Sequence, residues 1–150
     1  MHKKLKIKIN YELSQIEKLI EKSQTLFQKC KLSEPDFIET SAFASVMHSF
    51  YTGIESIFIL IAKSIDKKVS EGERWHKALL KQMSKEIRAR DAVISDCLYT
   101  RLIDYLEFRH FFRHAYGFMV DWSKMKKLFN DFDSTWEIFR KEIRIFIGKL

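Results

Sequence analysis

Glycine, proline and cysteine are all scarce in this sequence of 150 residues. It contains only 4 glycines and 1 proline, and a protein built from many β-strands needs more of both at its turns. The two cysteines, Cys30 and Cys97, lie far apart and form no C-x-x-C pair. They predict two buried or partly buried thiols in a reducing cytoplasm, rather than a disulfide framework or a zinc site.

Long apolar runs are also missing. The longest strictly apolar run is 57–62, whereas a transmembrane helix needs roughly 20 apolar residues. The basic N-terminus, MHKKLKIKIN, has no apolar segment of the kind found in signal peptides. We therefore expect a cytoplasmic protein that does not associate with a membrane.

The residues that are abundant are large, apolar or basic. Hydrophobic residues make up 46% of the chain, and 13 residues are phenylalanine, which favours a core of large side chains between helices. The net charge of +7 favours an acidic partner such as nucleic acid, but a need for solubility explains it almost as well. Charge alone therefore does not choose a function.

Helical periodicity predicts five helices in a single domain spanning 1–150. The first covers about 6–31, and the second runs from about 33 to 65, because Ser33, Pro35 and Asp36 form a typical helix start. A short third helix covers about 75–85, Ser95 caps the fourth, and the fifth covers about 122–148. The expected fold is all-α: an antiparallel bundle of four long helices plus a short one.

The fifth predicted helix carries apolar residues in steps of three and four over more than three heptads, from Trp122 to Phe146. Such a seam must be covered along its whole length. It packs either within the bundle or against a second copy of the chain.

The segment from Glu107 to Gly117, EFRHFFRHAYG, concentrates chemically active side chains in a few residues. A purely structural interpretation turns its phenylalanines to the core and its charges to solvent. A metal site is a second interpretation, since His110 and His114 share a helix face. No third ligand is evident nearby, although His48 or Glu55 could be recruited in space.

Metal-free cleavage of a phosphodiester is the third interpretation. Histidine exchanges protons near neutral pH, and arginine offers a permanently charged fork of donors to a phosphoryl group. RNA supplies its own nucleophile in the 2′-hydroxyl. An Arg/His site is therefore chemically sufficient for RNA cleavage with no cofactor.

The residues Arg109, His114 and Tyr116 spell R-x4-H-x-Y, which resembles the signature of HEPN ribonucleases in the tyrosine-bearing form of the HepT toxins. His110 also matches the polar residue that commonly follows the arginine. The stretches YTGIESIFILIAKSID and WHKALLKQM, around the loop containing Gly72, are similar to the HepT pattern as well. The resemblance covers about 51–116.

This resemblance implies a homodimeric endoribonuclease toxin that needs no metal, with the two motifs facing each other across a cleft. His114 would be the general base or acid, and Arg109 would hold the scissile phosphate. The implied partner is a minimal nucleotidyltransferase antitoxin that transfers AMP to Tyr116. That group would fill the site and repel RNA phosphates.

The spacing of the motif raises a geometric question, because five residues on an ideal helix leave Arg109 and His114 roughly 140° apart. Either the helix distorts before His114, or a second chain completes the site. Arg113 shares a face with Arg109 and is a candidate second phosphate contact. Glu55 either supports an arginine or histidine of the motif or forms a surface or interface salt bridge.

A different class of function also fits the resemblance. A non-catalytic HEPN subunit would bind a nucleotide or a nucleotidyltransferase and cut nothing. The intact set of Arg109, His114 and Tyr116 weighs against it, because a binding module does not need all three together.

Overall fold

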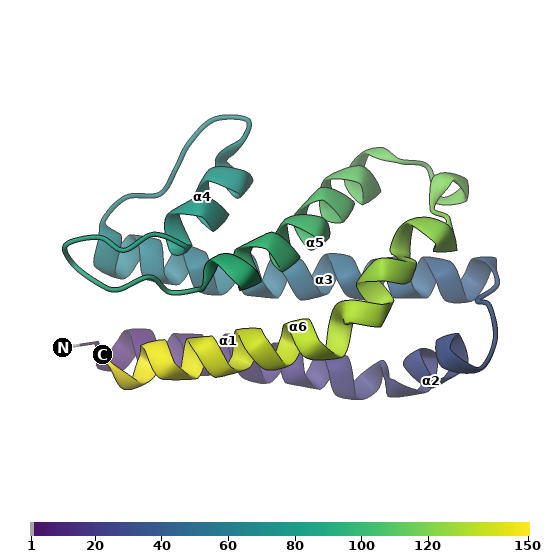
Figure 1. The fold of residues 1–150 in the computed structure, drawn as a ribbon, viewed down its shortest axis with the longest axis horizontal. Coiled ribbons are helices and arrows are strands. Elements are labelled where there is room, and N and C mark those ends of the chain that lie inside the picture. The colour runs from purple at the N-terminus through teal and green to yellow at the C-terminus, as the bar shows by residue number, and fades with distance from the viewer. Residues whose placement is uncertain (1) are drawn as a thin grey trace.

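The computed structural model describes residues 2–150, and four long helices account for most of them. These are α1 (Lys3–Lys22), α3 (Phe37–Ile61), α5 (Asp96–His114) and α6 (Trp122–Gly148), joined by the short α2 (Gln24–Leu32) and α4 (Trp75–Met83). Successive long helices run in opposite directions, and the two ends of the chain lie close together (Figure 1). No strand occurs within 2–150, so the predicted all-α antiparallel bundle is confirmed.

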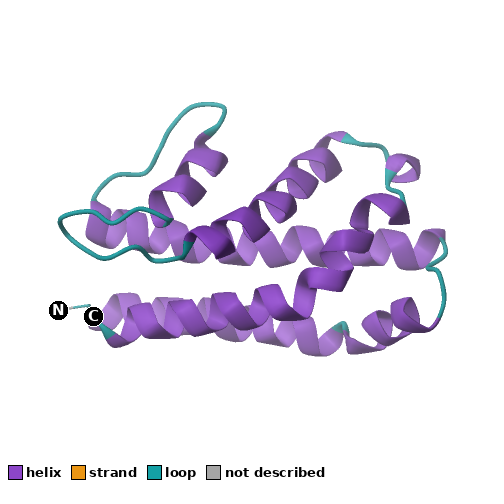
Figure 2. Cartoon of the chain, viewed as in Figure 1, coloured by secondary structure: helices purple, strands orange, loops and turns teal. Residues whose placement is uncertain are grey.

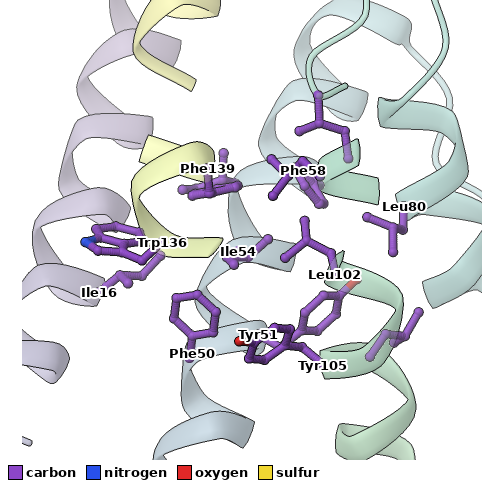
Figure 3. Close-up of a cluster of buried hydrophobic side chains, with 14 of the residues drawn as sticks. Ile16, Phe50, Tyr51, Ile54, Phe58, Leu80, Leu102, Tyr105, Trp136 and Phe139 are labelled. Atoms are coloured by element: carbon purple, nitrogen blue, oxygen red, sulfur yellow. The ribbon is translucent and has the colours of Figure 1, made fainter. Parts of the chain in front are cut away.

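Helix α3 is the central element and packs against α1, α2, α4 and α5. Its buried side chains meet those of the surrounding helices in one continuous core, as Figure 3 shows for Tyr51 and Ile54 among residues of α1, α4, α5 and α6. A Cβ atom at Gly53 would lie 2.7 Å from Cγ1 of Ile16. The absence of a side chain at Gly53 therefore lets α1 and α3 approach closely.

Among the described residues, one helical stretch, Phe37–Asp66, is long and apolar enough to span a membrane by length and composition. Half of its most apolar window is buried inside the protein. The buried core helix of a bundle meets the same criteria, and α3 is such a helix here.

Phenylalanine rings fill the core, as the composition predicted. Phe43 of α3 packs edge-on against Phe27 of α2 and against Trp122 and Phe129 of α6, with ring centroids 5.3–5.9 Å apart. Each such aromatic pair adds about 0.5–1.5 kcal/mol beyond the area it buries. These contacts hold α2 and α6 to the N-terminal half of α3.

The seam of α6 faces the inside of this bundle. Its central residues are almost fully buried, including Met125, Phe132, Phe139 and Ile143. Of the two possibilities left open by the sequence, packing within the bundle is the one found. The seam is therefore not a free surface for a second chain.

The first predicted helix is broken in two, which the periodicity did not indicate. Ser23 ends α1, and its hydroxyl donates to the carbonyl of Leu19 at 2.8 Å. A serine that bonds back to the preceding turn competes with the helical backbone. The chain then continues as α2 in a new direction (Figure 1).

The start of the second predicted helix was placed too early. Asp36 is the true N-cap, since its carboxylate accepts from the backbone of Glu39 and the Glu39 carboxylate accepts from the backbone of Asp36. This reciprocal capping box satisfies two free N–H groups. Ser33 instead ends α2, and Pro35 lies in the connection.

Two long loops flank α4 (Figure 2), and the second, 84–95, is held by one buried ion pair. Arg90 donates from Nε and Nη2 to both carboxylate oxygens of Asp66, at 2.7 and 2.6 Å. Asp66 ends a π-helical turn, Ala62–Asp66, that continues α3. This pair explains why a segment without helical periodicity is nevertheless ordered.

The two cysteines differ in exposure. Cys30 is buried, and burial raises the pKa of its thiol. Cys97 is exposed on the first turn of α5. The prediction of a buried or partly buried thiol was therefore wrong for Cys97, because its position faces away from the bundle.

Candidate functional site

The motif predicted from the sequence lies at the C-terminal end of α5. Ser95 is the N-cap of α5, as predicted, and its hydroxyl accepts a hydrogen bond from the backbone N–H of Leu98 at 3.1 Å. It then runs without a break to His114, and the backbone becomes extended at Ala115. Of the two alternatives left open by the spacing, a distortion of the helix before His114 is not found, so the angular separation of Arg109 and His114 remains.

Arg109 is fixed against α3 by a single hydrogen bond. Its Nε donates to the hydroxyl of Thr52 at 3.3 Å, and its side chain is half-buried. The rest of the guanidinium makes no hydrogen bond or ion pair with any residue of 2–150. Arg109 is therefore positioned by the fold while most of its donors remain available.

Two polar residues of α3, His48 and Thr52, lie one turn apart and contact this part of α5. Glu55 follows at helical spacing and contacts α4 instead. The His48 ring packs against Phe112, with centroids 5.5 Å apart. Its pKa is lowered first by burial and then by the charges of Arg109 and Arg113, which favours the neutral form of the imidazole.

Arg113 lies one turn after Arg109 and is exposed. Within residues 2–150 it has no carboxylate within ion-pair distance, and the same is true of Arg109. Two neighbouring guanidinium groups without counter-charges form a local positive field. Both arginines line one groove and lie near His48, as expected from their shared helix face.

The two histidines of the motif lie together on the solvent side of α5. His110 and His114 are both exposed, and their ring centroids are 4.7 Å apart. No group of three or more histidine, cysteine or acidic side chains arranged to hold a metal ion occurs in the described part of the chain. The pair therefore has no third ligand nearby.

Tyr116 follows the helix in an extended conformation, and its side chain is 71% exposed. Its ring stacks almost parallel on that of Phe118, with centroids 5.8 Å apart. Phe118 belongs to a short 3₁₀ turn, Gly117–Met119, and is also exposed. The tyrosine hydroxyl is therefore accessible to a large partner.

Glu55 does not contact the motif. Its carboxylate is buried and lies 2.7 Å from Nδ1 of His76 at the start of α4. Of the two roles left open by the sequence, the salt-bridge type of contact is found, although it is buried rather than on the surface. His76 in turn stacks on Trp75, with centroids 3.7 Å apart.

Tyr51 lies on α3 one turn before Glu55 and is fully buried. Burial is the main cause, and Glu55 a second, of a strongly raised pKa for its hydroxyl. Its hydroxyl oxygen has no hydrogen-bond partner among the described residues. The side chain therefore acts as a neutral part of the core behind Arg109.

Comparison with protein families identifies the chain. A family model described as "HepT-like protein" matches residues 42–150. The chain belongs to the HepT-like family of HEPN-domain proteins. The match begins within α3 and includes all of α6, so it extends well beyond the 51–116 segment that carried the resemblance. No curated protein and no solved structure gives a significant match.

Two residues beside the motif were not predicted as parts of the site. Thr52 was not singled out, and His48 was considered only as a possible metal ligand. The signal that points to both is their spacing with Glu55 on one face of an apolar helix. Polar residues in register on a buried helix indicate a partner on the neighbouring element.

Proposed function

We propose that this HepT-like protein is the toxin of a toxin–antitoxin pair and an endoribonuclease that needs no metal ion. The observation that carries the proposal is the pair Arg109 and Arg113, positioned beside His48 and Thr52 and lacking carboxylate partners. Arginine is almost never fully buried unless it is paired, and the half-buried Arg109 has only one long hydrogen bond. HEPN domains are generally related to ribonucleases, which supports RNA as the anion that these charges meet.

The cleavage step uses the nucleophile of the substrate. The 2′-oxygen of RNA attacks the adjacent phosphorus and loses its proton to a histidine, while the 5′-oxygen leaves with a proton from an acid. The products are a 2′,3′-cyclic phosphate and a 5′-hydroxyl. His114 is the general base or the general acid of this step, and Arg109 stabilises the charge that develops on the phosphoryl oxygens.

A homodimer would complete this site. On the unbroken helix α5, Arg109 and His114 point in directions that differ by roughly 140°. Two motifs facing each other would let Arg109 of one chain and His114 of the other meet the same phosphate. The exposure of His114 is consistent with that arrangement.

Tyr116 is the proposed regulatory position, and a minimal nucleotidyltransferase is the proposed antitoxin. The Tyr116 oxygen would attack the α-phosphorus of ATP, lose its proton and release pyrophosphate, leaving AMP on the tyrosine. The added phosphate would lie near the positive charges of the motif and compete with RNA. The exposure of Tyr116 supports this role.

RNA cleavage in the presence of a chelator tests the proposal. Wild-type protein should cut RNA in EDTA, and His114→Ala should be slower by about 10²–10⁴-fold, the usual contribution of general acid–base catalysis. His2→Ala is the matched control, since His2 lies at the start of α1, at the other end of the molecule (Figure 1). Strict dependence on a divalent ion, or full activity of His114→Ala, would contradict the mechanism.

A wild-type protein that cuts no RNA but binds a nucleotidyltransferase would favour the non-catalytic HEPN subunit instead.

Modification of the protein by the antitoxin and ATP is followed by mass spectrometry. Tyr116→Phe should not be modified and should keep its ribonuclease activity. Inactivation of this variant by AMP transfer to another residue would refute the assignment of Tyr116.

A further inference from the structure

A groove of about 420 Å³ lies between the start of α4 and the second half of α5. Arg74, His76 and Lys77 line one side, and Arg109 and Arg113 line the other. Sites for small molecules usually have volumes of about 300–1,000 Å³. The groove is therefore large enough for one nucleotide unit.

Positive charge dominates the groove. None of its four arginine and lysine side chains forms an ion pair with a carboxylate of residues 2–150. Two carboxylates, Glu73 and Glu107, also line it. They leave an excess of positive charge, and as acceptors they suit the amino groups on the edges of bases.

The groove also has an apolar part, formed by Ile103 and Leu106 of α5. Leu106 is almost fully buried and Ile103 is half-buried. An apolar surface beside four cations offers contacts to both parts of a nucleotide, the flat base and the charged phosphate. A simple anion would use only the charged part.

A hydrogen-bond contact with a buried carboxylate holds the α4 side of the groove in place. Glu55 is 4% exposed and contacts Nδ1 of His76, which lines the groove. The carboxylate leaves Nε2 as the ring nitrogen that can face a ligand. Arg74 and Lys77, on either side of His76, are thus attached to a fixed point of the core.

We infer that this groove is an RNA-binding subsite that holds the nucleotide next to the scissile phosphate. Arg74 and Lys77 contact backbone phosphates, and the exposed part of Ile103 contacts a base. Arg109 and His110 belong both to the groove and to the motif, so an RNA strand in the groove continues directly to the proposed cleavage site. The inference rests on the proposed function for the identity of the ligand, but its test does not require cleavage.

Binding of a single-stranded RNA with methylated 2′-hydroxyls tests the subsite, because this RNA cannot be cut. Fluorescence anisotropy over a series of salt concentrations compares wild type with Arg74→Ala/Lys77→Ala. The dissociation constant should rise at least about tenfold, since two charge-assisted contacts are lost. The slope of log affinity against log salt should fall by about 0.7 per lost contact, or about 1.4 in total.

Arg88→Ala/Lys141→Ala is the matched control, because Arg88 and Lys141 are exposed, lie outside the groove and form no ion pair among residues 2–150. It should change the affinity and the salt slope little. A helical circular dichroism spectrum and an unchanged melting temperature show that the double variant is folded.

The outcomes separate this inference from the proposed function. Equal affinity and an equal salt slope for wild type and Arg74→Ala/Lys77→Ala overturn the subsite, even if wild type cuts RNA. Weaker binding by the double variant supports the subsite, even if wild type cuts nothing. No binding by any form overturns the subsite as well.

Discussion

Arg90 and Arg109 show two opposite uses of the same side chain. Arg90 is 8% exposed, and its guanidinium donates to both oxygens of Asp66 and to the carbonyls of Lys85 and Asp91. Arg109 makes one long hydrogen bond, to the Thr52 hydroxyl, and has no carboxylate partner within residues 2–150. The first arginine is neutralised by the fold, and the second is only positioned by it.

The difference separates a structural cation, Arg90, from a proposed functional one, Arg109. Burying a charge is costly unless it is paired and hydrogen-bonded, and Arg90 meets both conditions. Arg109 keeps most of its donors free and has Arg113 beside it, an arrangement that does not stabilise the folded chain. We propose that an external anion, the RNA phosphate, is the partner of this arrangement.

Arg90→Ala should have the largest effect on stability. Removing one member of a buried ion pair leaves Asp66 uncompensated and should lower the free energy of unfolding by about 3–5 kcal/mol. Urea unfolding measures the loss, and Arg88→Ala in the same loop is the control, because Arg88 is exposed and makes no ion pair among residues 2–150. The double variant Arg90→Ala/Asp66→Ala should lose less than the sum of the two single variants. Wild-type stability in Arg90→Ala would contradict the structural role of this pair.

Thr52→Val should have a smaller effect, this time on activity. It removes the acceptor of the Arg109 Nε hydrogen bond without changing the size of the side chain. A net hydrogen-bond contribution of about 0.5–1.5 kcal/mol corresponds to cleavage slowed by about 2- to 10-fold. Thr100→Val is the control, since the Thr100 hydroxyl bonds only within α5. An unchanged rate of cleavage would mean that Thr52 does not position Arg109.

The smallest expected effect is on the titration of His48. Arg109→Ala should raise the pKa of His48, since the charge of Arg109 is one cause of its lowering, but burial should keep it below its ordinary value. Arg88→Ala should leave it unchanged, because Arg88 is not among the charges that shift it. NMR of the imidazole protons measures both. A lower pKa in Arg109→Ala would contradict the description of Arg109 as an uncompensated charge.

The same lowered pKa fixes a direction for the pH dependence of stability. Folded His48 binds a proton more weakly than an unfolded histidine, whose pKa is about 6.5. Its contribution to stability is therefore complete above that pH and is lost as the pH falls below it. In Arg109→Ala this loss on acidification should be smaller.

The sequence predicted the elements whose pattern repeats over many turns. The apolar seam predicted a helix at about 122–148, and α6 spans Trp122–Gly148. The prediction succeeded because a long amphipathic helix is specified by every one of its turns. Ser23 broke the first helix without a sequence signal, since a serine bonded to Leu19 resembles any surface serine. The start of α3 depended on whether Ser33 or Asp36 forms the capping hydrogen bonds, and Asp36 forms them.

The candidate site was predicted where it is local in sequence and missed where it is not. Arg109 and Tyr116 lie on and just after one helix, so their spacing alone located them. The contact from Arg109 to Thr52 joins residues 57 positions apart, and the pairing of Glu55 with His76 links two helices. Such contacts depend on how α3, α4 and α5 cross, which no local pattern encodes.

RNA cleavage in EDTA by wild type, Arg109→Ala and Arg88→Ala is the most direct test of the contrast between a positioned and a neutralised arginine. Wild type and Arg88→Ala should cut at the same rate. Arg109→Ala should cut about 10²–10³-fold more slowly, the usual effect of losing one donor to a developing charge, while its urea unfolding stays close to that of wild type. Cleavage by folded Arg109→Ala at the wild-type rate would contradict the account.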